Sequence, residues 1–157
     1  MASSGSKRFD GPGNMFTLLY PEDWRFEILE EKTVTFHRTS DPLGSLRVTA
    51  WTLKDEPNAL DRFMSSERER MSALQKQEER VVSLRPIDEA TLKGFLRVSN
   101  CMEDGVPAAM FMWLLGSPGA ETVVVGTYII PRAKVDDPRA KKELDMVNHM
   151  LIGIILR

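Results

Sequence analysis

Two adjacent apolar segments between Val106 and Pro131 constrain the fold of this chain most strongly. They read VPAAMFMWLL and TVVVGTYIIP, with the turn sequence GSPGAE between them. In the first segment both alternating sets of side chains are apolar, so a strand here must be covered on both of its faces. We therefore predict that the two segments form a hairpin in the middle of a sheet.

Shorter segments on either side predict the rest of this sheet. Apolar and polar residues alternate in most of them, which is typical of strands with one buried face. Two of the segments end at Pro21 and Pro86, because proline cannot donate a hydrogen bond to a sheet ladder. Short turns between neighbouring strands imply antiparallel pairing. The predicted strands are 15–21, 24–29, 33–37, 46–53, 81–84 and 92–99.

Two amphipathic helices complete the predicted fold. Apolar residues recur at helical spacing from Ala59 to about Gln77, and again from Pro138 to about Leu156. Asp137 is placed to cap the second helix. Because two helices are available for the two faces of the central hairpin, we predict an α+β fold. It is an antiparallel β-sheet of about six to eight strands with helices covering both faces.

The length of 157 residues suits one domain with its own core. Residues 1–14 are rich in Ser, Gly, Lys and Pro, so we predict a disordered leader there and a single domain over 15–157. The first residues contain no apolar run of the kind found in secretory signals. Cys101 is the one cysteine, which fits a reducing compartment. We therefore expect a cytoplasmic protein.

Charge and hydropathy argue against two classes of partner. The 21 basic and 23 acidic residues are interspersed and give a net charge of −2, whereas nucleic-acid binding needs a basic excess on one face. No apolar stretch approaches the roughly 20 residues of a membrane span. We expect neither nucleic acid nor a membrane-spanning segment.

The N-terminal half carries a family pattern. It consists of Phe16-Thr-Leu-Leu-Tyr-Pro21, then Trp24, then Val34-Thr-Phe36 and Gly44-Ser-Leu46-Arg-Val48. This pattern resembles the PsbP-like fold family, and the order of elements agrees from residue 15 to residue 157. That family includes the extrinsic photosystem II subunit, a nuclear-import factor that binds the Ran GTPase, and many bacterial proteins. The thylakoid targeting segment of the plant subunit is absent, so the uncharacterised bacterial branch is nearer. The resemblance implies a PsbP-like α/β/α sandwich that acts in interaction or assembly, without chemistry of its own.

Motifs for catalysis, metals and cofactors are missing from the sequence. A thiol nucleophile needs a base within hydrogen-bond reach, and the spacing sets neither His37 nor His149 beside Cys101. No Cys-x-x-Cys, His-Glu-x-x-His, calcium-loop or phosphate-loop pattern occurs. We assign no catalytic residue, no metal and no cofactor. A hydrolase that uses Cys101 or Glu67 is the least favoured hypothesis.

Glu67 breaks the apolar stripe of the first helix, where it falls between Met64 and Met71. Such a carboxylate could pair with an arginine, or it could sit in a pocket that perturbs its pKa. We favour a position at the rim of the stripe, with the stem packed and the carboxylate in water, because glutamate is almost never buried unpaired.

The hypothesis that this protein binds a partner is based on its methionine and tryptophan residues. Met112 and Trp113 lie in a Met-rich stretch, and such surfaces adapt to varied apolar partners, although the same residues could simply fill the core. Trp51 shares a predicted strand face with Arg47, and this pair of residue types is enriched at interfaces. The favoured function is a non-enzymatic adaptor or small chaperone that binds an unidentified protein partner. A homodimer through the apolar end of the last helix or an exposed sheet face is a further hypothesis, and the alternative is a protein that binds a small ligand in a Met/Trp-lined pocket.

Overall fold

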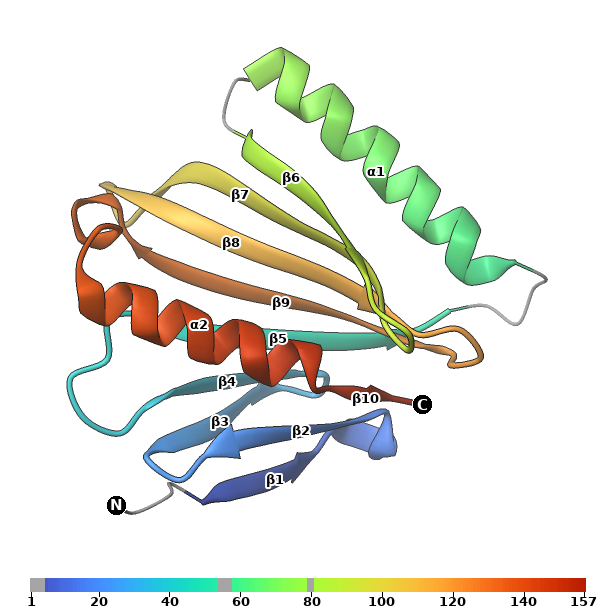
Figure 1. Cartoon of the computed structure of the whole chain (residues 1–157), viewed down its shortest axis with the longest axis horizontal. Helices are drawn as coiled ribbons and strands as arrows, with labels where there is room; N and C mark the ends of the chain where they lie inside the picture. The colour runs from blue at the N-terminus through green and yellow to red at the C-terminus, as the bar shows by residue number, and fades with distance from the viewer. Residues whose placement is uncertain (1–4, 54–57, 79–80) are drawn as a thin grey trace.

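A computed structural model describes residues 5–53, 58–78 and 81–157, and it contains two antiparallel sheets and two α-helices (Figure 1). The N-terminal part comprises β1 (Ser6–Asp10), the 3-10 turn η1 (Pro12–Asn14), β2 (Phe16–Pro21), β3 (Trp24–Glu30), β4 (Thr33–Arg38) and β5 (Ser45–Thr52). The rest comprises α1 (Ala59–Glu78), β6 (Val81–Asp88), β7 (Lys93–Glu103), β8 (Val106–Gly116), β9 (Thr122–Pro131), η2 (Arg132–Lys134), α2 (Pro138–Ile152) and β10 (Ile155–Leu156).

The central position predicted for the 106–131 hairpin is confirmed. The larger sheet has the order β3-β4-β5-β9-β8-β7-β6, so β8 and β9 both lie in its interior. The turn from β7 to β8 has positive φ at both central residues, Asp104 (51°) and Gly105 (80°). This backbone conformation is typical of the two-residue turns that join the strands of a tight hairpin. β5 pairs with β9 along its whole length and so joins the N-terminal strands to the central hairpin.

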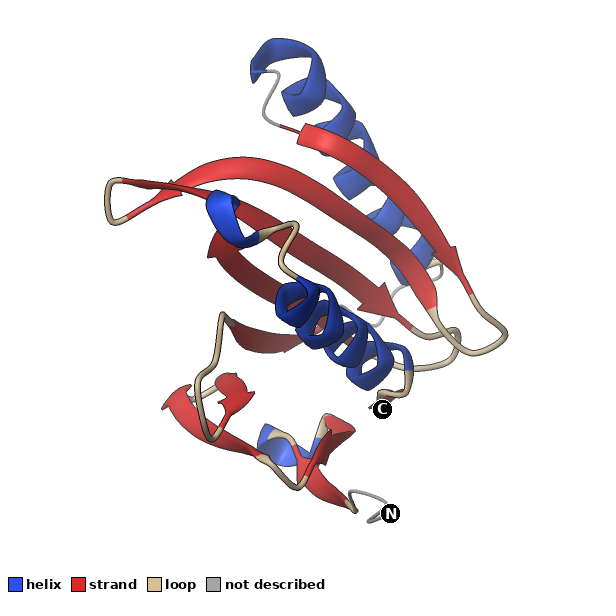
Figure 2. Cartoon of the chain, turned by 60° about the vertical axis from the view of Figure 1, so that its left-hand side comes forward, coloured by secondary structure: helices blue, strands red, loops and turns tan. Residues whose placement is uncertain are grey.

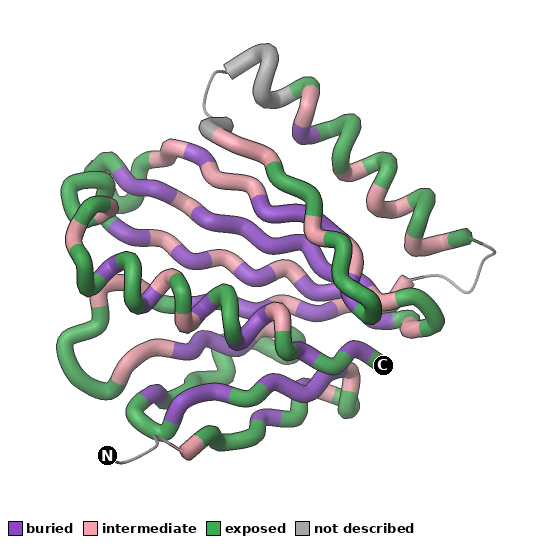
Figure 3. The backbone as a smooth tube through the Cα atoms, in the orientation of Figure 1, coloured by how far each residue is buried: buried purple, intermediate pink, exposed green. Residues whose placement is uncertain are grey.

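The two faces of this sheet are covered to different extents. α2 crosses one face (Figure 2). On that face, Trp113 and Leu115 of β8 belong to the large hydrophobic core, together with Val147 and Leu151 of α2. On the other face, alternate β8 residues Met112 and Leu114 form a smaller cluster with Phe95 of β7 and Met71 of α1. α1 runs beside β6 at the sheet edge, and Figure 3 shows more exposed than buried residues in the part of α1 that is not grey. The prediction of helices covering both faces is therefore not confirmed in that form.

Gly116 sets how closely α1 can approach the sheet. A Cβ added at this glycine would lie 2.3 Å from Cδ1 of Leu60 and 3.2 Å from Cε of Met64, which are both residues of α1. A side chain here would require the ends of the Leu60 and Met64 side chains to move out of this contact.

The segment 5–14 is structured, which differs from the predicted disordered leader. β1 pairs with β2 from Ser6 to Asp10, and Phe9 is buried against the rings of Phe16, Phe26 and Phe36. The polar composition of this segment led to the prediction, but one aromatic residue buries enough apolar surface to hold the strand. Residues 1–4 lie outside the described residues.

The chain end also differs from the prediction. α2 stops at Ile152 instead of continuing to about Leu156, because Gly153 follows it and the last residues form β10 beside β2. Ile154 and Leu156 are buried in the main core. The chain itself thus covers the apolar end of α2, which removes the basis for predicting a dimer through that end.

β6 continues past Pro86, where the sequence predicted that it would stop. It runs to Asp88 and pairs with β7 through the proline, opposite Phe95. β6 is an edge strand and pairs on one side only, so the missing N–H of Pro86 need not break the hydrogen-bond ladder to β7.

Candidate functional site

The less covered face of the larger sheet gathers most of the residues predicted for binding. The register of four neighbouring strands aligns Arg47 with Thr127, Thr127 with Met112, and Met112 with Arg97. The adjacent row, nearer the start of β8, contains Met110 and Ile129, which are half-buried. We call this surface the open face: Arg47, Thr49, Arg97, Met110, Met112, Thr127 and Ile129.

Arg47 and Met112 lie on the open face, and Trp51 lies at its border with α1. Arg47 is exposed and, within the described residues, its side chain makes no hydrogen bond or ion pair. Trp51 is half-buried, with its ring 5.8 Å from the ring of Phe63 on α1 in an edge-to-face arrangement. Trp51 thus packs against the smaller cluster. Replacing it would lower the stability of the protein and would also remove part of the exposed surface.

Trp113 lies on the opposite face from the other predicted binding residues. It is only 1% exposed, and its indole Nε1 donates a hydrogen bond to Oδ1 of Asn148 on α2 at 3.1 Å. Side chains at neighbouring strand positions point to opposite faces, so Met112 and Trp113 cannot share one binding surface. Trp113 is a core residue that anchors α2.

Glu67 is half-buried on the side of α1 that meets the sheet. Its Oε2 accepts a hydrogen bond from Nη2 of Arg70 at 2.6 Å, one turn further along the helix. Its carboxylate is thus paired with an arginine, which is one of the arrangements considered from the sequence.

Arg97 was not singled out from the sequence, yet it is the most unusual group on the open face. Its Nε is buried without a hydrogen-bond partner, and Nη2 donates only to the sulfur of Met112 at 3.6 Å. Burial lowers the pKa of the Arg97 guanidinium, the charge of Arg70 lowers it further, and Glu67 opposes both effects. A thioether is a weak acceptor, so this guanidinium has unused capacity to bind an anionic group. The alternation of β7 placed Arg97 on a strand face but gave no sign of these neighbours.

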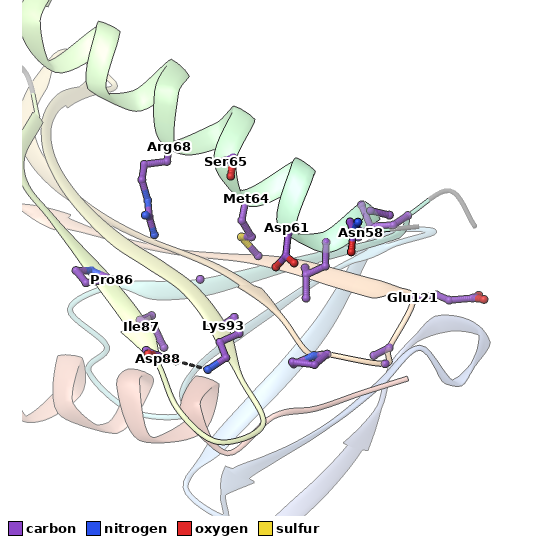
Figure 4. Close-up of a pocket in the computed structure, with 17 residues that line it drawn as sticks. Asn58, Asp61, Met64, Ser65, Arg68, Pro86, Ile87, Asp88, Lys93 and Glu121 are labelled. Atoms are coloured by element: carbon purple, nitrogen blue, oxygen red, sulfur yellow. Dashed lines mark hydrogen bonds and ion pairs between the residues drawn. The ribbon is translucent and has the colours of Figure 1, made fainter. Parts of the chain in front are cut away.

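A cleft of about 890 Å³ opens between the first half of α1, the β6–β7 turn and the β8–β9 loop (Figure 4). Asp61 and Arg68 extend into it from α1, while Lys93 and Asp88 form an ion pair on the opposite wall. Met64 also lines it from α1, but none of the described lining residues is a tryptophan. The cleft therefore matches the predicted Met/Trp-lined pocket only in part.

Glu143 of α2 forms a buried polar cluster on the opposite face. Its carboxylate accepts hydrogen bonds from the backbone N–H of Leu43 (3.0 Å) and of Gly44 (3.1 Å), and from the hydroxyl of Tyr128 (2.7 Å). Arg38 lies 3.9 Å away. Burial raises the pKa of Tyr128, and the hydrogen bond to Glu143 raises it further. The cluster is closed and fully paired, which indicates a structural role.

The groups considered for catalysis and metal binding do not assemble in the described part of the chain. Cys101 is half-buried on β7, and among the residues described no hydrogen bond joins it to His37 or His149. Across residues 5–53, 58–78 and 81–157, no three His, Cys, Asp or Glu side chains gather in a set that could hold a metal ion. None of the helices, as far as they are described, has the length and apolar character needed to cross a membrane.

Comparison with known proteins identifies the fold. No protein-family model matches the sequence, and no curated protein matches it. Among solved structures, a protein of Bacteroides thetaiotaomicron VPI-5482 matches 96% of this chain with a TM-score of 0.62 and 19% identity. This chain spans 48% of that structure, about half its length.

Two further structures match over nearly their whole length. The Ran-binding protein Mog1p of Saccharomyces cerevisiae has a TM-score of 0.60 and 12% identity, with 98% of this chain and 96% of Mog1p covered. LpqN of Mycobacterium tuberculosis, described as involved in cell envelope biogenesis, has a TM-score of 0.52 and 13% identity, with 99% and 86% covered. At these identities the likeness concerns the fold. Mog1p and LpqN share the PsbP-like fold, so the PsbP-like fold predicted from the N-terminal pattern is confirmed.

Proposed function

We propose that this protein is a non-enzymatic binding or assembly module and that the open face is its protein-binding surface. The observation that carries the proposal is a half-buried apolar patch, Met110 and Ile129 on the central strands β8 and β9, with Arg47 and Arg97 on the strands to either side. Neither arginine makes an ion pair within the described residues. The comparisons support it at the level of the fold, since Mog1p is a Ran-binding protein. The single cysteine suits a reducing compartment, and we propose the cytoplasm.

The chemistry of the open face specifies the kind of partner. Met110 and Ile129 are half-buried and can cover apolar side chains of a partner, and methionine adapts to their shape. Arg47 on β5 and Arg97 on β7 flank this apolar strip on opposite sides, with β9 and β8 between them. Arginine binds carboxylates with two parallel hydrogen bonds. The partner is therefore a protein segment that presents apolar residues with an acidic residue on either side.

A charge reversal on the open face tests this proposal. Arg47→Glu places a negative charge where the partner's carboxylate would bind, and Arg47 is exposed and unpaired, so folding should be unaffected. We expect gentle affinity purification from the native cells, read by mass spectrometry, to recover a stoichiometric protein with the wild type and at least tenfold less of it with Arg47→Glu. A loss of about 1.4 kcal/mol of binding free energy corresponds to that factor.

Arg85→Glu is the matched control. Arg85 is an exposed arginine on β6, but it pairs in register with Leu96, which belongs to the core on the α2 face. Its reversal changes the net charge by the same amount on the other side of the sheet. If both variants lose the partner equally, or if Arg47→Glu retains it, the open face is not the binding surface.

The cleft beside α1 supports a second candidate function, the binding of a small polar ligand. Its volume suits a small molecule, and the carboxylate of Asp61 and the guanidinium of Arg68 reach into it from one helix. Groups of both signs suit a zwitterionic ligand. Native mass spectrometry of the purified protein tests this function: a bound small molecule that Arg68→Ala releases supports it, and an unliganded mass under native conditions contradicts it.

A further inference from the structure

β3 is the open edge of the larger sheet. It pairs with β4 on one side only, and all its residues from Arg25 to Glu30 are exposed. Apolar side chains stand among them, with Phe26 39% and Ile28 65% exposed. The strand at the opposite edge, β6, is less available for pairing, because it contains Pro86 and lies beside α1. Proline and a neighbouring helix protect an edge from pairing, and β3 has neither.

The hydrogen bonds of β4 show which backbone groups of β3 are unpaired. The carbonyl of Asp23 accepts from the N–H of Thr39 at 2.8 Å, and the carbonyl of Lys32 accepts from the N–H of Ala50 on β5 at 3.1 Å. Backbone polar groups alternate in direction along a strand. Arg25 and Glu27 therefore direct their N–H and C=O groups towards β4, whereas Trp24, Phe26 and Ile28 direct theirs to the open side.

The regular part of β3 is five residues long and has Phe26 at its centre. The strand begins at Trp24, and a bulge follows Ile28 before Glu30 pairs with Thr33. This segment reads Trp-Arg-Phe-Glu-Ile, with a basic and an acidic residue at equal distances from the centre. Within the described residues, neither Arg25 nor Glu27 makes an ion pair. The segment is thus complementary in charge to an antiparallel copy of itself.

We propose that β3 pairs with β3 of a second copy of this chain, around a two-fold axis that passes beside Phe26. In this register Phe26 faces Phe26 of the second copy, and Trp24 faces Ile28, so the outward N–H and C=O groups of both strands are satisfied. Arg25 of each copy then lies opposite Glu27 of the other, at the closely spaced type of antiparallel pair. The two seven-stranded sheets join into one continuous sheet, and the aromatic and apolar side chains at positions 26 and 28 are covered.

This dimer uses a different surface from the open face, so it goes beyond the proposed function and does not depend on it. Arg47→Glu should leave the dimer intact, because Arg47 lies on β5, two strands away from the edge. If Arg47→Glu loses the protein partner but still forms the dimer, the two surfaces are distinct. A charge reversal on β3 that abolishes the dimer but keeps the protein partner would show the same.

Sedimentation velocity over a range of concentrations tests the pairing. We expect a concentration-dependent dimer for the wild type. Arg25→Glu and Glu27→Arg each place like charges opposite one another, so each variant alone should show at least tenfold weaker dimerisation. Mixed in equal amounts, the two variants should regain the dimer, because every facing pair then carries opposite charges. Both positions are exposed, and circular dichroism would confirm that the variants fold.

Crosslinking tests the register itself. In a Cys101→Ser background, Phe26→Cys puts two thiols at facing positions, where the Cα separation of about 5.5 Å suits a disulfide. Ile28→Cys is the matched control, since the two copies of this position are offset by four residues, or about 13 Å. We expect oxidation to link the Phe26→Cys chains and not the Ile28→Cys chains. A wild-type monomer at all concentrations, dimers unaffected by either charge reversal, no recovery on mixing, or equal crosslinking at both positions would each overturn the proposal.

Discussion

Glu143 is the residue on which the packing of three distant segments depends. It is a buried charge inside the apolar stripe of α2, and its carboxylate joins the loop before β5 to β9 through Gly44 and Tyr128. A buried carboxylate is tolerated only when its acceptor sites are filled. Here two backbone donors and one hydroxyl fill them, and Arg38 adds a positive charge nearby.

The hydrogen bond from Tyr128 to Glu143 predicts a pH dependence at the alkaline end. Because the folded state raises the pKa of Tyr128 above its ordinary value of 10.0, the folded protein holds this proton where the unfolded chain releases it. The contribution to stability is complete below pH 10 and is lost as the pH rises above it. Urea denaturation of the wild type should show the free energy of unfolding falling more steeply above pH 10 than in Tyr128→Phe.

The comparison with Tyr128→Phe isolates one group, because the two proteins differ only in the hydroxyl of residue 128. Tyr128→Phe should also be less stable at neutral pH by about 1 to 2 kcal/mol, since Glu143 loses a hydrogen bond inside the core. Parallel curves for the two proteins from pH 8 to the alkaline limit would show that Tyr128 does not retain its proton.

Glu67 and Glu143 each interrupt the apolar stripe of a helix, and they show what the sequence can predict about a single residue. The interruption at Glu67 was visible from its spacing, and its pairing with Arg70 is local in sequence. Glu143 interrupts the stripe of α2 in the same way, but its partners at Leu43 and Gly44 are about 100 residues away. Local spacing can locate an unusual carboxylate, and only the tertiary fold supplies its partners. The same holds for Arg97 on the open face.

At the scale of elements, β1 shows how one side chain can order a polar segment. Phe9 contacts three aromatic rings, those of Phe16 on β2, Phe26 on β3 and Phe36 on β4, with ring centroids 4.8 to 5.9 Å away. The rest of β1 is exposed. Almost all the apolar surface that β1 buries therefore belongs to this ring.

Phe9→Ala should lower the free energy of unfolding by about 3 kcal/mol, because a buried ring is removed from an aromatic cluster. Arg8→Ala is the matched control, since Arg8 is the neighbouring residue on the exposed side of β1 and its ion pair with Asp10 is a surface pair. Thermal and urea denaturation of the two variants measure the difference. Equal stability of Phe9→Ala and the wild type would mean that β1 is not held by this ring.

The strands that could be predicted are those whose pattern is long and regular. The 106–131 hairpin was placed correctly in the middle of the sheet because both faces of its first strand are apolar, and Asp104-Gly105 gave the turn before it. β1 and β10 were not predicted. Each is short, with five residues in β1 and two in β10, and each is held in place by pairing with β2. Such pairing leaves no local periodicity to detect.

At the scale of the whole molecule, the last residues connect the two sheets. β10 extends the small sheet beside β2, and the N–H of Arg157 donates to the carbonyl of Met15 at 2.9 Å. The carbonyl of Arg157 accepts from the N–H of Thr122 at 3.0 Å, where β9 of the larger sheet begins. One residue therefore bridges the backbones of both sheets, and the side chains of β10 decide how firmly this bridge is held.

Adjacent positions in β10 allow a matched test of the bridge. Leu156 is 9% exposed and belongs to the main core, whereas Ile155 is 55% exposed on the other side of the strand. Leu156→Ser should lower the free energy of unfolding by about 2 kcal/mol or more, through lost apolar burial and a buried hydroxyl. Ile155→Ser removes a side chain of the same size from the exposed side and should change stability by less than about 1 kcal/mol.

Hydrogen exchange distinguishes a bridge between the sheets from a local contact. If β10 couples the two sheets, Leu156→Ser should speed amide exchange both in β2 and at the start of β9, because the N–H of Thr122 loses its acceptor when β10 detaches. Faster exchange in β2 alone would show that β10 stabilises only the small sheet. Since Leu156 reaches the same core as Leu151 of α2, we expect the effect to extend into both sheets, which would make the chain end part of the cooperative fold.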